Sequence, residues 1–245
     1  MKQKNFPRHF PYQHPTFGTV KRPKTARAWE SSVYYWWWCF LKRNKSYLEC
    51  CENGGRGPLA EHYKDFGDVR GDDFKAWWAE DNRGARLFAE PRIENSVRVL
   101  AENDQVPSAE ESVTISFPLN MPKHYLLKRC QQILAKTREG GRGKQYSRNS
   151  NAPYRITGQP NITSLRRILT VYDAIEAARE RKPKRPYWRI ATDLNLIKED
   201  DKVLPSDSPL VAENKRNVMK AIISRLKRRA DALIKQSVTK EFIGK

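Results

Sequence analysis

A run of nine large, mostly aromatic residues, VYYWWWCFL at positions 33–41, constrains the fold more than any other stretch of the sequence. Its rings recur at spacings of three and four, so the run predicts a helix with a broad apolar face. Ser31 or Ser32 is the candidate N-cap, and the helical pattern continues beyond a break near Asn44. Because a face this wide belongs in a core, we expect a globular protein built around it.

The charge of the chain is strongly positive and unevenly distributed. Among 245 residues, 47 Lys and Arg oppose 28 Asp and Glu, which gives a formal net charge of +19. Residues 1–29 carry a net +7, residues 30–117 a net −5, residues 118–160 a net +8 and residues 161–245 a net +9. The aromatic middle is therefore mildly acidic, and the three basic segments indicate a polyanionic partner.

Several classes of protein are disfavoured by what the sequence lacks. It has no apolar run near the roughly 18 residues of a membrane span, and its start has no apolar signal-peptide stretch. It has no glycine-rich phosphate loop, and Cys39, Cys50, Cys51 and Cys130 lack the paired spacing of a zinc site. We therefore expect a soluble, cytoplasmic protein with no membrane partner, no metal, no cofactor and buried thiols.

The charge blocks and the breaks in periodicity predict a mainly α fold with a small β element, in four parts. Residues 1–29 form a basic arm, and residues 30–136 an aromatic-rich helical domain with a β-hairpin and a basic helix. Residues 137–160 form a linker rich in Gly, Ser, Asn and Pro. Residues 161–245 form a helix-turn-helix-like module of three helices that binds nucleic acid.

The second half of the aromatic-rich domain changes period. Val97–Leu100 and Val113–Phe117 alternate apolar and polar residues, so they predict a β-hairpin. A basic helix is expected from about residue 122, with Lys123, Lys128 and Arg129 on its outer face. Its expected inner face consists of Tyr125, Leu126, Cys130, Ile133 and Leu134.

The aspartates between residues 65 and 73 allow a different interpretation, a metal-dependent nuclease with Asp65, Asp68, Asp72 and Asp73 as ligands. Catalytic divalent metals take carboxylates that converge from different elements, whereas these four lie in one short stretch. Asp72 or Asp73 also suits the N-cap of a second aromatic helix, which is expected to end near Gly84. Capping is therefore favoured over catalysis.

The C-terminal segment opens with two amphipathic patterns. The first covers residues 161–182, with Asn161, Thr163 or Ser164 as its cap. The second, PYWRIATDLNL, starts at Pro186 and has the spacing of the supporting helix of a helix-turn-helix, in which a small Ala lets the partner helix approach.

A last helix, expected from Glu213 to Thr239, follows an unusually long acidic connection, residues 197–212. Opposite its apolar arc, which includes Val218, lies a basic arc with few acids to pair with it. Arg and Lys suit guanine, Asn suits adenine, and Ser and Lys suit phosphate. The candidate groove residues are Asn217, Lys220, Ser224, Arg225, Lys227 and Arg228. The candidate phosphate contacts are Arg166, Arg167, Lys184, Arg185, Arg189, Lys123, Lys128, Arg129, Arg142, Lys21 and Arg22.

Five short sequence segments carry a resemblance to a known family. In chain order they are WWWCFLKRNKSYLECC, PLNMPKHYLLKR, LRRILTVYDA, PYWRIATDLNL and ISRLKRRADALI. Together they resemble the regulator-like helix-turn-helix proteins of bacterial phages and integrative mobile elements. Those proteins join an aromatic N-terminal domain, with a W-x-x-x-F-L-x-R-N phrase, to a C-terminal helix-turn-helix. The resemblance implies a DNA-associated role in a mobile element, and the long connection before the last helix departs from the pattern.

These features favour a non-enzymatic DNA-binding protein, a regulator or architectural factor associated with the nucleoid, with duplex DNA as its partner. The alternative is an RNA-binding subunit of a ribonucleoprotein, which the Arg-Gly linker, Tyr146 and Tyr154 support. The metal-dependent nuclease is a third hypothesis. The acidic aromatic domain also offers a surface to a protein partner, alongside any of these functions.

Overall fold

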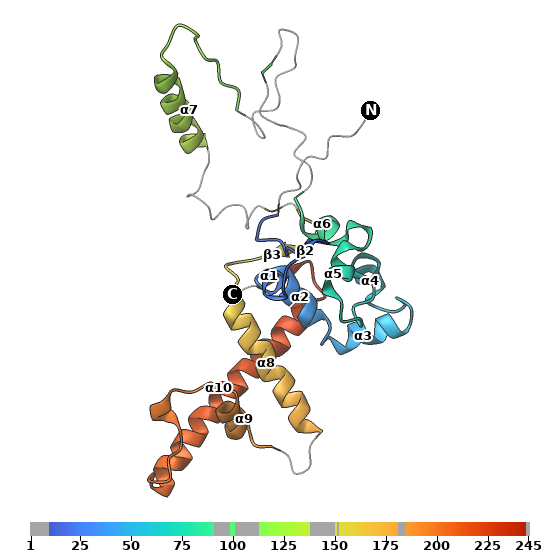
Figure 1. The fold of residues 1–245 in the computed structure, drawn as a ribbon, viewed down its shortest axis with the longest axis vertical. Helices are drawn as coiled ribbons and strands as arrows, with labels where there is room; N and C mark the ends of the chain where they lie inside the picture. Colours follow the sequence, from blue (N-terminus) through green and yellow to red (C-terminus); the bar gives the residue numbers. More distant parts are fainter. Residues whose placement is uncertain are drawn as a thin grey trace.

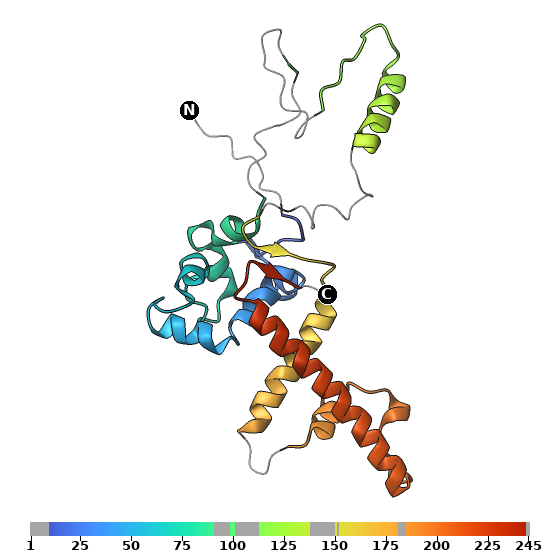
Figure 2. The ribbon, with the colours of Figure 1, turned by 180° about the vertical axis from the view of Figure 1, so that it is seen from behind.

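The fold is organised around two long helices that cross. The computed structural model describes residues 10–90, 99–100, 113–137, 150, 152–180 and 185–243. This part of the chain is mainly helical, as expected, with two short β pairs. Helices α8 (Ile162–Arg179) and α10 (Pro209–Gln236) pack against each other and cross (Figure 1). Helices α1–α6 gather around one end of this pair, and α9 (Tyr187–Asp193) lies near the other end, as the view from behind also shows (Figure 2).

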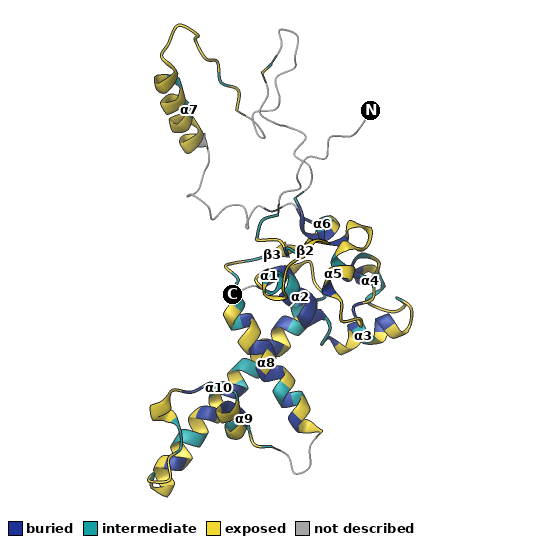
Figure 3. Cartoon of the chain, viewed as in Figure 1, coloured by how far each residue is buried: buried dark blue, intermediate teal, exposed yellow. Residues whose placement is uncertain are grey.

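The aromatic body, which we define as residues 27–88, is built on the core helix that the sequence indicates. Eight of the nine residues of α2 are buried (Figure 3). The break near Asn44 is confirmed, because the Asn44 side chain accepts a hydrogen bond from the Tyr47 backbone N–H (3.1 Å) and caps α3. Ser32 precedes α2, but its hydroxyl donates to the Gln13 carbonyl oxygen instead of capping the helix. The helices of the body are α1 Arg27–Glu30, α2 Val33–Leu41, α3 Lys45–Glu52, α4 Ala60–Phe66, α5 Phe74–Ala79 and α6 Arg83–Phe88.

The core of this body is completed by segments distant in sequence. Trp37 is fully buried, and its indole N–H donates to the Ser237 carbonyl oxygen (2.8 Å). The Trp37 ring stacks on Phe242 with centroids 4.9 Å apart. Tyr154 is also buried, and its hydroxyl donates to the Asp65 carboxylate (2.8 Å). One core therefore combines residues from both sides of segment 137–160 with Tyr154 and Ile156, which lie within the segment that was expected to be a linker. Its rings are packed together rather than displayed for stacking on bases.

The second aromatic helix, α5, begins as expected and ends earlier. Asp73 caps it by accepting from the Ala76 backbone N–H (2.9 Å). The helix stops at Ala79, because a 3-10 turn follows at Glu80–Asn82, where Asp81 adopts a positive φ of 48°. Gly84, expected near the end of α5, instead lies inside α6 against the Trp78 ring, where an added Cβ would come within 2.1 Å of that ring.

The expected hairpin is wrong in its described part, because Val113–Phe117 and residues 99–100 have no regular secondary structure. Residues 97–98 lie outside the described residues. Both Val113 and Phe117 are exposed, and alternation stabilises a strand only where a neighbouring strand and a core cover its apolar side. The strands lie elsewhere and have two residues each: β1 Gly18–Thr19 is antiparallel to β2 Arg22–Pro23, and β3 Arg155–Ile156 is parallel to β4 Glu241–Phe242.

The expected basic helix is present as α7 (Lys123–Thr137), directly after Pro122. Its apolar face was expected inside, and this is wrong: between Lys123 and Lys136 every residue is exposed or half-buried, including Tyr125 and Leu134 (Figure 3). Amphipathic periodicity therefore predicted the helix correctly, but it did not determine whether another element covers the face.

The C-terminal helices follow the sequence patterns closely. The Asn161 side chain caps α8 by accepting from the Ser164 backbone N–H (2.9 Å), and the apolar residues of α8 are buried. Ala191 of α9 is fully buried in a second core shared by α8, α9 and α10, which agrees with the close helix approach that a small residue permits. None of the helices in the described ranges is both long and apolar enough to cross a membrane.

The last helix, α10, begins at Pro209, four residues before the expected start at Glu213. Ser208 is its N-cap, and Pro209 occupies the first helical position, where its missing N–H does not matter. Val218, expected in the apolar arc, is 52% exposed, and Met219 is buried in its place. Ile223, Ala230 and Leu233 of the expected arc are buried, so the arc keeps its direction, and Val218 lies at its edge because it is turned about 100° from Met219.

Candidate nucleic-acid interface

The candidate interface is the outward side of α10. This helix has 28 residues, so it is about 42 Å long, and it carries eight basic and two acidic side chains. Its apolar arc is buried against α8 and α9, through residues that include Met219, Ile223 and Ala230. The packing therefore fixes which side of α10 faces solvent.

The solvent side carries most of the expected groove residues. Lys220, Arg225 and Arg228 are exposed, and so are Asn217 and Arg229. Within the described residues no ion pair involves Lys220, Arg225, Arg228 or Arg229, and the Lys220 amine donates only to the Asn217 side chain (3.2 Å). We name these four cations the basic arc.

Two of the expected groove residues are less available than the basic arc. Lys227 is half-buried and pairs with Asp231 at 2.6 Å, the one acid that the sequence places one turn further along α10. Ser224 is also half-buried. Both lie beside the basic arc rather than at its most exposed part.

The indole of Trp188 lies beside the basic arc and contacts two guanidinium groups. The guanidinium carbons of Arg189 and Arg216 lie 5.4 Å and 5.2 Å from the Trp188 ring centroid. Cations are attracted to the face of an indole, so these contacts hold both side chains near the start of the arc. Sequence reasoning singled out Arg189 but missed Arg216, although Arg216 precedes Lys220 by one helical turn.

Three expected phosphate contacts are engaged within the protein. Arg166 pairs with Glu30 at 2.8 Å and also lies over the Trp36 ring. The Arg167 guanidinium donates to the Leu196 carbonyl oxygen (2.9 Å), and Arg185 forms an ion pair with Asp193. These residues tie α8, α9 and the aromatic body together, so their charge is partly compensated before any ligand binds.

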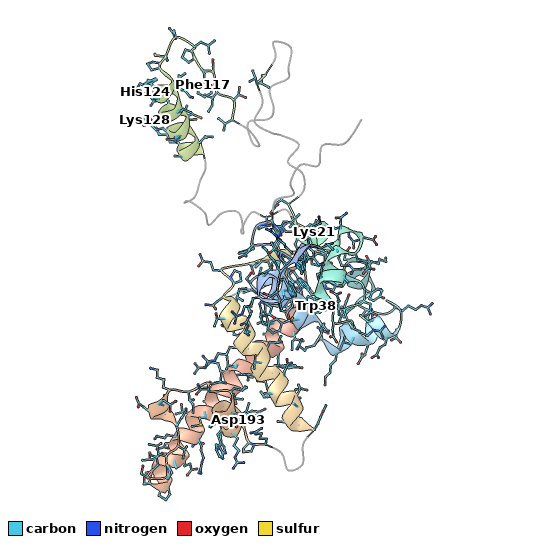
Figure 4. All side chains as sticks on the ribbon, in the orientation of Figure 1. Lys21, Trp38, Phe117, His124, Lys128 and Asp193 are labelled. Atoms are coloured by element: carbon cyan, nitrogen blue, oxygen red, sulfur yellow. The ribbon has the colours of Figure 1, made fainter. Side chains whose placement is uncertain are left out.

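The remaining expected contacts do not join this surface. Lys21 and Arg22 are exposed on the β1–β2 hairpin at the aromatic body, and α7 carries three more (Figure 4). Figure 4 shows Lys21, Lys128 and the α9 residue Asp193 on three separate parts of the molecule. Arg142 and Lys184 lie outside the described residues. The contacts on α7 are Lys123, Lys128 and Arg129, of which Arg129 donates to the Gln132 side chain (3.0 Å).

The aspartates considered as metal ligands each take a different partner. Asp65 accepts from Tyr154, and Asp73 caps α5. The guanidinium of Arg70 hydrogen-bonds Asp68 and holds the pKa of that carboxyl below its ordinary value; the amine of Lys42 does the same to Asp72. In the described ranges, no group of three or more His, Cys, Asp or Glu side chains is arranged to hold a metal ion.

The thiols behave largely as expected. Cys39, Cys50 and Cys51 are buried and unpaired, and Cys130 on α7 is half-buried. Burial disfavours the thiolate and raises the pKa of Cys39 to about 11.

Comparison of the chain with protein-family models, curated proteins and solved structures finds no match. The resemblance to regulators of phages and integrative elements therefore stays a prediction from the five sequence phrases.

Proposed function

We propose that this protein is a non-enzymatic DNA-binding protein, a regulator or architectural factor of a phage or mobile element, that acts on the nucleoid in the bacterial cytoplasm. The observation that supports it is the basic arc of α10. Four exposed cations that have no acidic partner among the described residues repel one another along one helix, and a polyanion relieves that repulsion.

The dimensions of the arc suit a duplex. From Lys220 to Arg229 the helix rises about 14 Å, which is close to the roughly 12 Å width of a major groove. The exposed Asn217 at one end adds a side chain that hydrogen-bonds adenine edges. In this arrangement α9 supports α10, as in a helix-turn-helix, and the connection from α9 to α10 is longer than the usual turn of that motif.

The test is a binding titration with a duplex of about 30 base pairs, at salt concentrations from about 50 to about 200 mM. If about six phosphates are neutralised, the logarithm of the affinity falls with the logarithm of salt at a slope near −5. The double variant Lys220→Gln and Arg228→Gln reduces that slope by about two, because each lost phosphate contact reduces it by about one. Fluorescence anisotropy measures both quantities.

Lys45→Gln is the matched control, since Lys45 is an exposed lysine on α3 of the aromatic body and its loss leaves the slope unchanged. A slope that does not change in the double variant contradicts the proposed interface. Competition that favours structured RNA over duplex DNA of equal length contradicts the DNA assignment. Magnesium-dependent nicking of a plasmid by the purified protein contradicts the non-enzymatic part of the proposal.

A further inference from the structure

A groove of about 810 Å³ lies between α9, the connection that precedes α10, and the first half of α10. Its walls combine apolar side chains from α9, the connection and the start of α10 with charged side chains from the connection and from one side of α10. Of the basic arc, only Lys220 lines this groove. The groove is lined by Trp188, Val203, Leu204, Pro205, Asp207, Pro209, Ala212, Glu213, Arg216 and Lys220.

The wall formed by the connection is pinned to α10. The Lys215 amine donates to the Lys202 carbonyl oxygen (2.9 Å) and pairs with the Asp207 carboxylate (3.0 Å). The Leu204 backbone N–H also donates to Asp207 (2.7 Å), and together these groups lower the pKa of the Asp207 carboxyl. The negative charge of Asp207 is therefore already compensated, and Leu204 is held in place with 49% of its surface exposed.

The opposite wall holds a cation with an unused donor. The Arg216 guanidinium lies over Trp188, and among the described residues its buried Nε has no hydrogen-bond partner and no acid forms an ion pair with it. The Lys220 amine follows one turn further along α10. A guanidinium with no described ion-pair partner can take an anion from the groove, and a carboxylate is the acceptor that suits the planar guanidinium fork best.

The acid on the same wall restricts where an anion fits. Glu213 precedes Arg216 by one turn, lines the groove and has no described ion-pair partner. It repels an anion at its own end, whereas Arg216 and Lys220 attract one at the other. A ligand that matches this pattern has one negative group at one end and an apolar body along Leu204, Pro205 and Pro209.

We propose that this groove binds an organic carboxylate with a flat apolar body, its carboxylate on Arg216 and Lys220 and its body against Trp188 and the Leu204 wall. Lys220 belongs both to the groove and to the basic arc. The bound carboxylate therefore neutralises a cation that the duplex also needs, and it weakens DNA binding. This second consequence rests on the proposed function, whereas ligand binding itself does not.

The test uses three aromatic carboxylates as probes: benzoate, indole-3-acetate and 2-naphthoate. Calorimetry on the full chain is expected to show binding of at least one probe, tightest for the largest ring. The neutral isostere 2-naphthylmethanol is expected to bind at least tenfold more weakly than 2-naphthoate, since it lacks the charge that Arg216 and Lys220 attract. This comparison needs no variant, so it does not depend on the folding of a mutant.

Arg216→Met is expected to weaken 2-naphthoate at least tenfold, because it keeps an apolar stem over Trp188 and removes the charge. Lys235→Met, which removes an exposed cation of α10 outside the groove, leaves the affinity unchanged. Absence of binding by all three probes, equal binding of 2-naphthylmethanol, or an unchanged affinity in Arg216→Met overturns the proposal.

The competition arm separates this inference from the proposed function. 2-Naphthoate is expected to raise the apparent dissociation constant for the duplex in the wild type but not in Arg216→Met. A probe that binds at Arg216 while the chain binds no duplex supports the groove and refutes the proposed function. Duplex binding by a chain that takes none of the probes refutes the groove alone.

Discussion

Replacing Phe242 with alanine is expected to lower the free energy of unfolding by about 3–5 kcal/mol, the cost of removing a buried aromatic ring from a core. The residue is close to Lys245, the last residue of the chain, yet it is fully buried. Its ring stacks on Trp37 and also contacts Phe40 at 5.8 Å between centroids. Alanine leaves a cavity that these rings cannot close without moving α2.

The backbone around Phe242 allows a sharp control. The Thr157 backbone N–H donates to the Phe242 carbonyl oxygen (2.9 Å), and Glu241 is the neighbouring residue of β4 with its side chain exposed. Glu241→Ala keeps the same strand pairing and is expected to change stability by less than about 0.5 kcal/mol. Urea unfolding followed by circular dichroism measures both variants. Equal, small effects would show that the C-terminal strand does not close the aromatic core.

The helix boundaries that the sequence predicted correctly are those set by local hydrogen bonds. Asn44, Asp73 and Asn161 each accept from a backbone N–H three residues further on. The capping residue and the N–H that it caps therefore lie within one helical turn, where the sequence pattern is local. The early start of α10 was missed because Ser208 and Pro209 stand in an acidic, proline-containing stretch that indicated a connection. A serine cap followed by proline is nevertheless a helix-start signal.

Contacts between distant segments could not be predicted from the sequence. Strands β3 and β4 have two residues each, too few for alternation to appear. They pair a segment that precedes α8 in the sequence with one that follows α10. Helical spacing within α10 was enough to predict that basic residues share its solvent side. It could not predict where the Arg216 side chain lies. That position depends on Trp188, which belongs to another helix.

Stability is expected to fall between pH 6.5 and pH 4 because of one buried histidine. His62 is 7% exposed, its ring stacks on Phe66 with centroids 4.3 Å apart, and Tyr154 packs against its edge. Burial disfavours the imidazolium and lowers the pKa of His62 to about 4, although the nearby Asp65 opposes this.

Acid lowers the stability because the folded and unfolded states bind different numbers of protons at His62. Between pH 6.5 and pH 4 the unfolded chain binds a proton at this histidine and the folded chain does not, so acid favours unfolding. The contribution of neutral His62 to the free energy of unfolding is fully present above about pH 6.5 and is lost as the pH falls toward 4. This loss is at most about 1.4 kcal/mol per pH unit. Across this window the loss is about 3 kcal/mol.

His62→Gln isolates this contribution, because the carboxylates of both proteins titrate alike and cancel in the comparison. From pH 7 to pH 4.5 the free energy of unfolding is expected to fall by about 2–3 kcal/mol less in the variant than in the wild type. His124→Gln is the matched control, since His124 is exposed on α7 and its replacement leaves the pH dependence unchanged. Parallel pH profiles for wild type and His62→Gln would mean that His62 has the same pKa in the folded and the unfolded protein. The aromatic core would then tolerate an imidazolium between Phe66 and Tyr154.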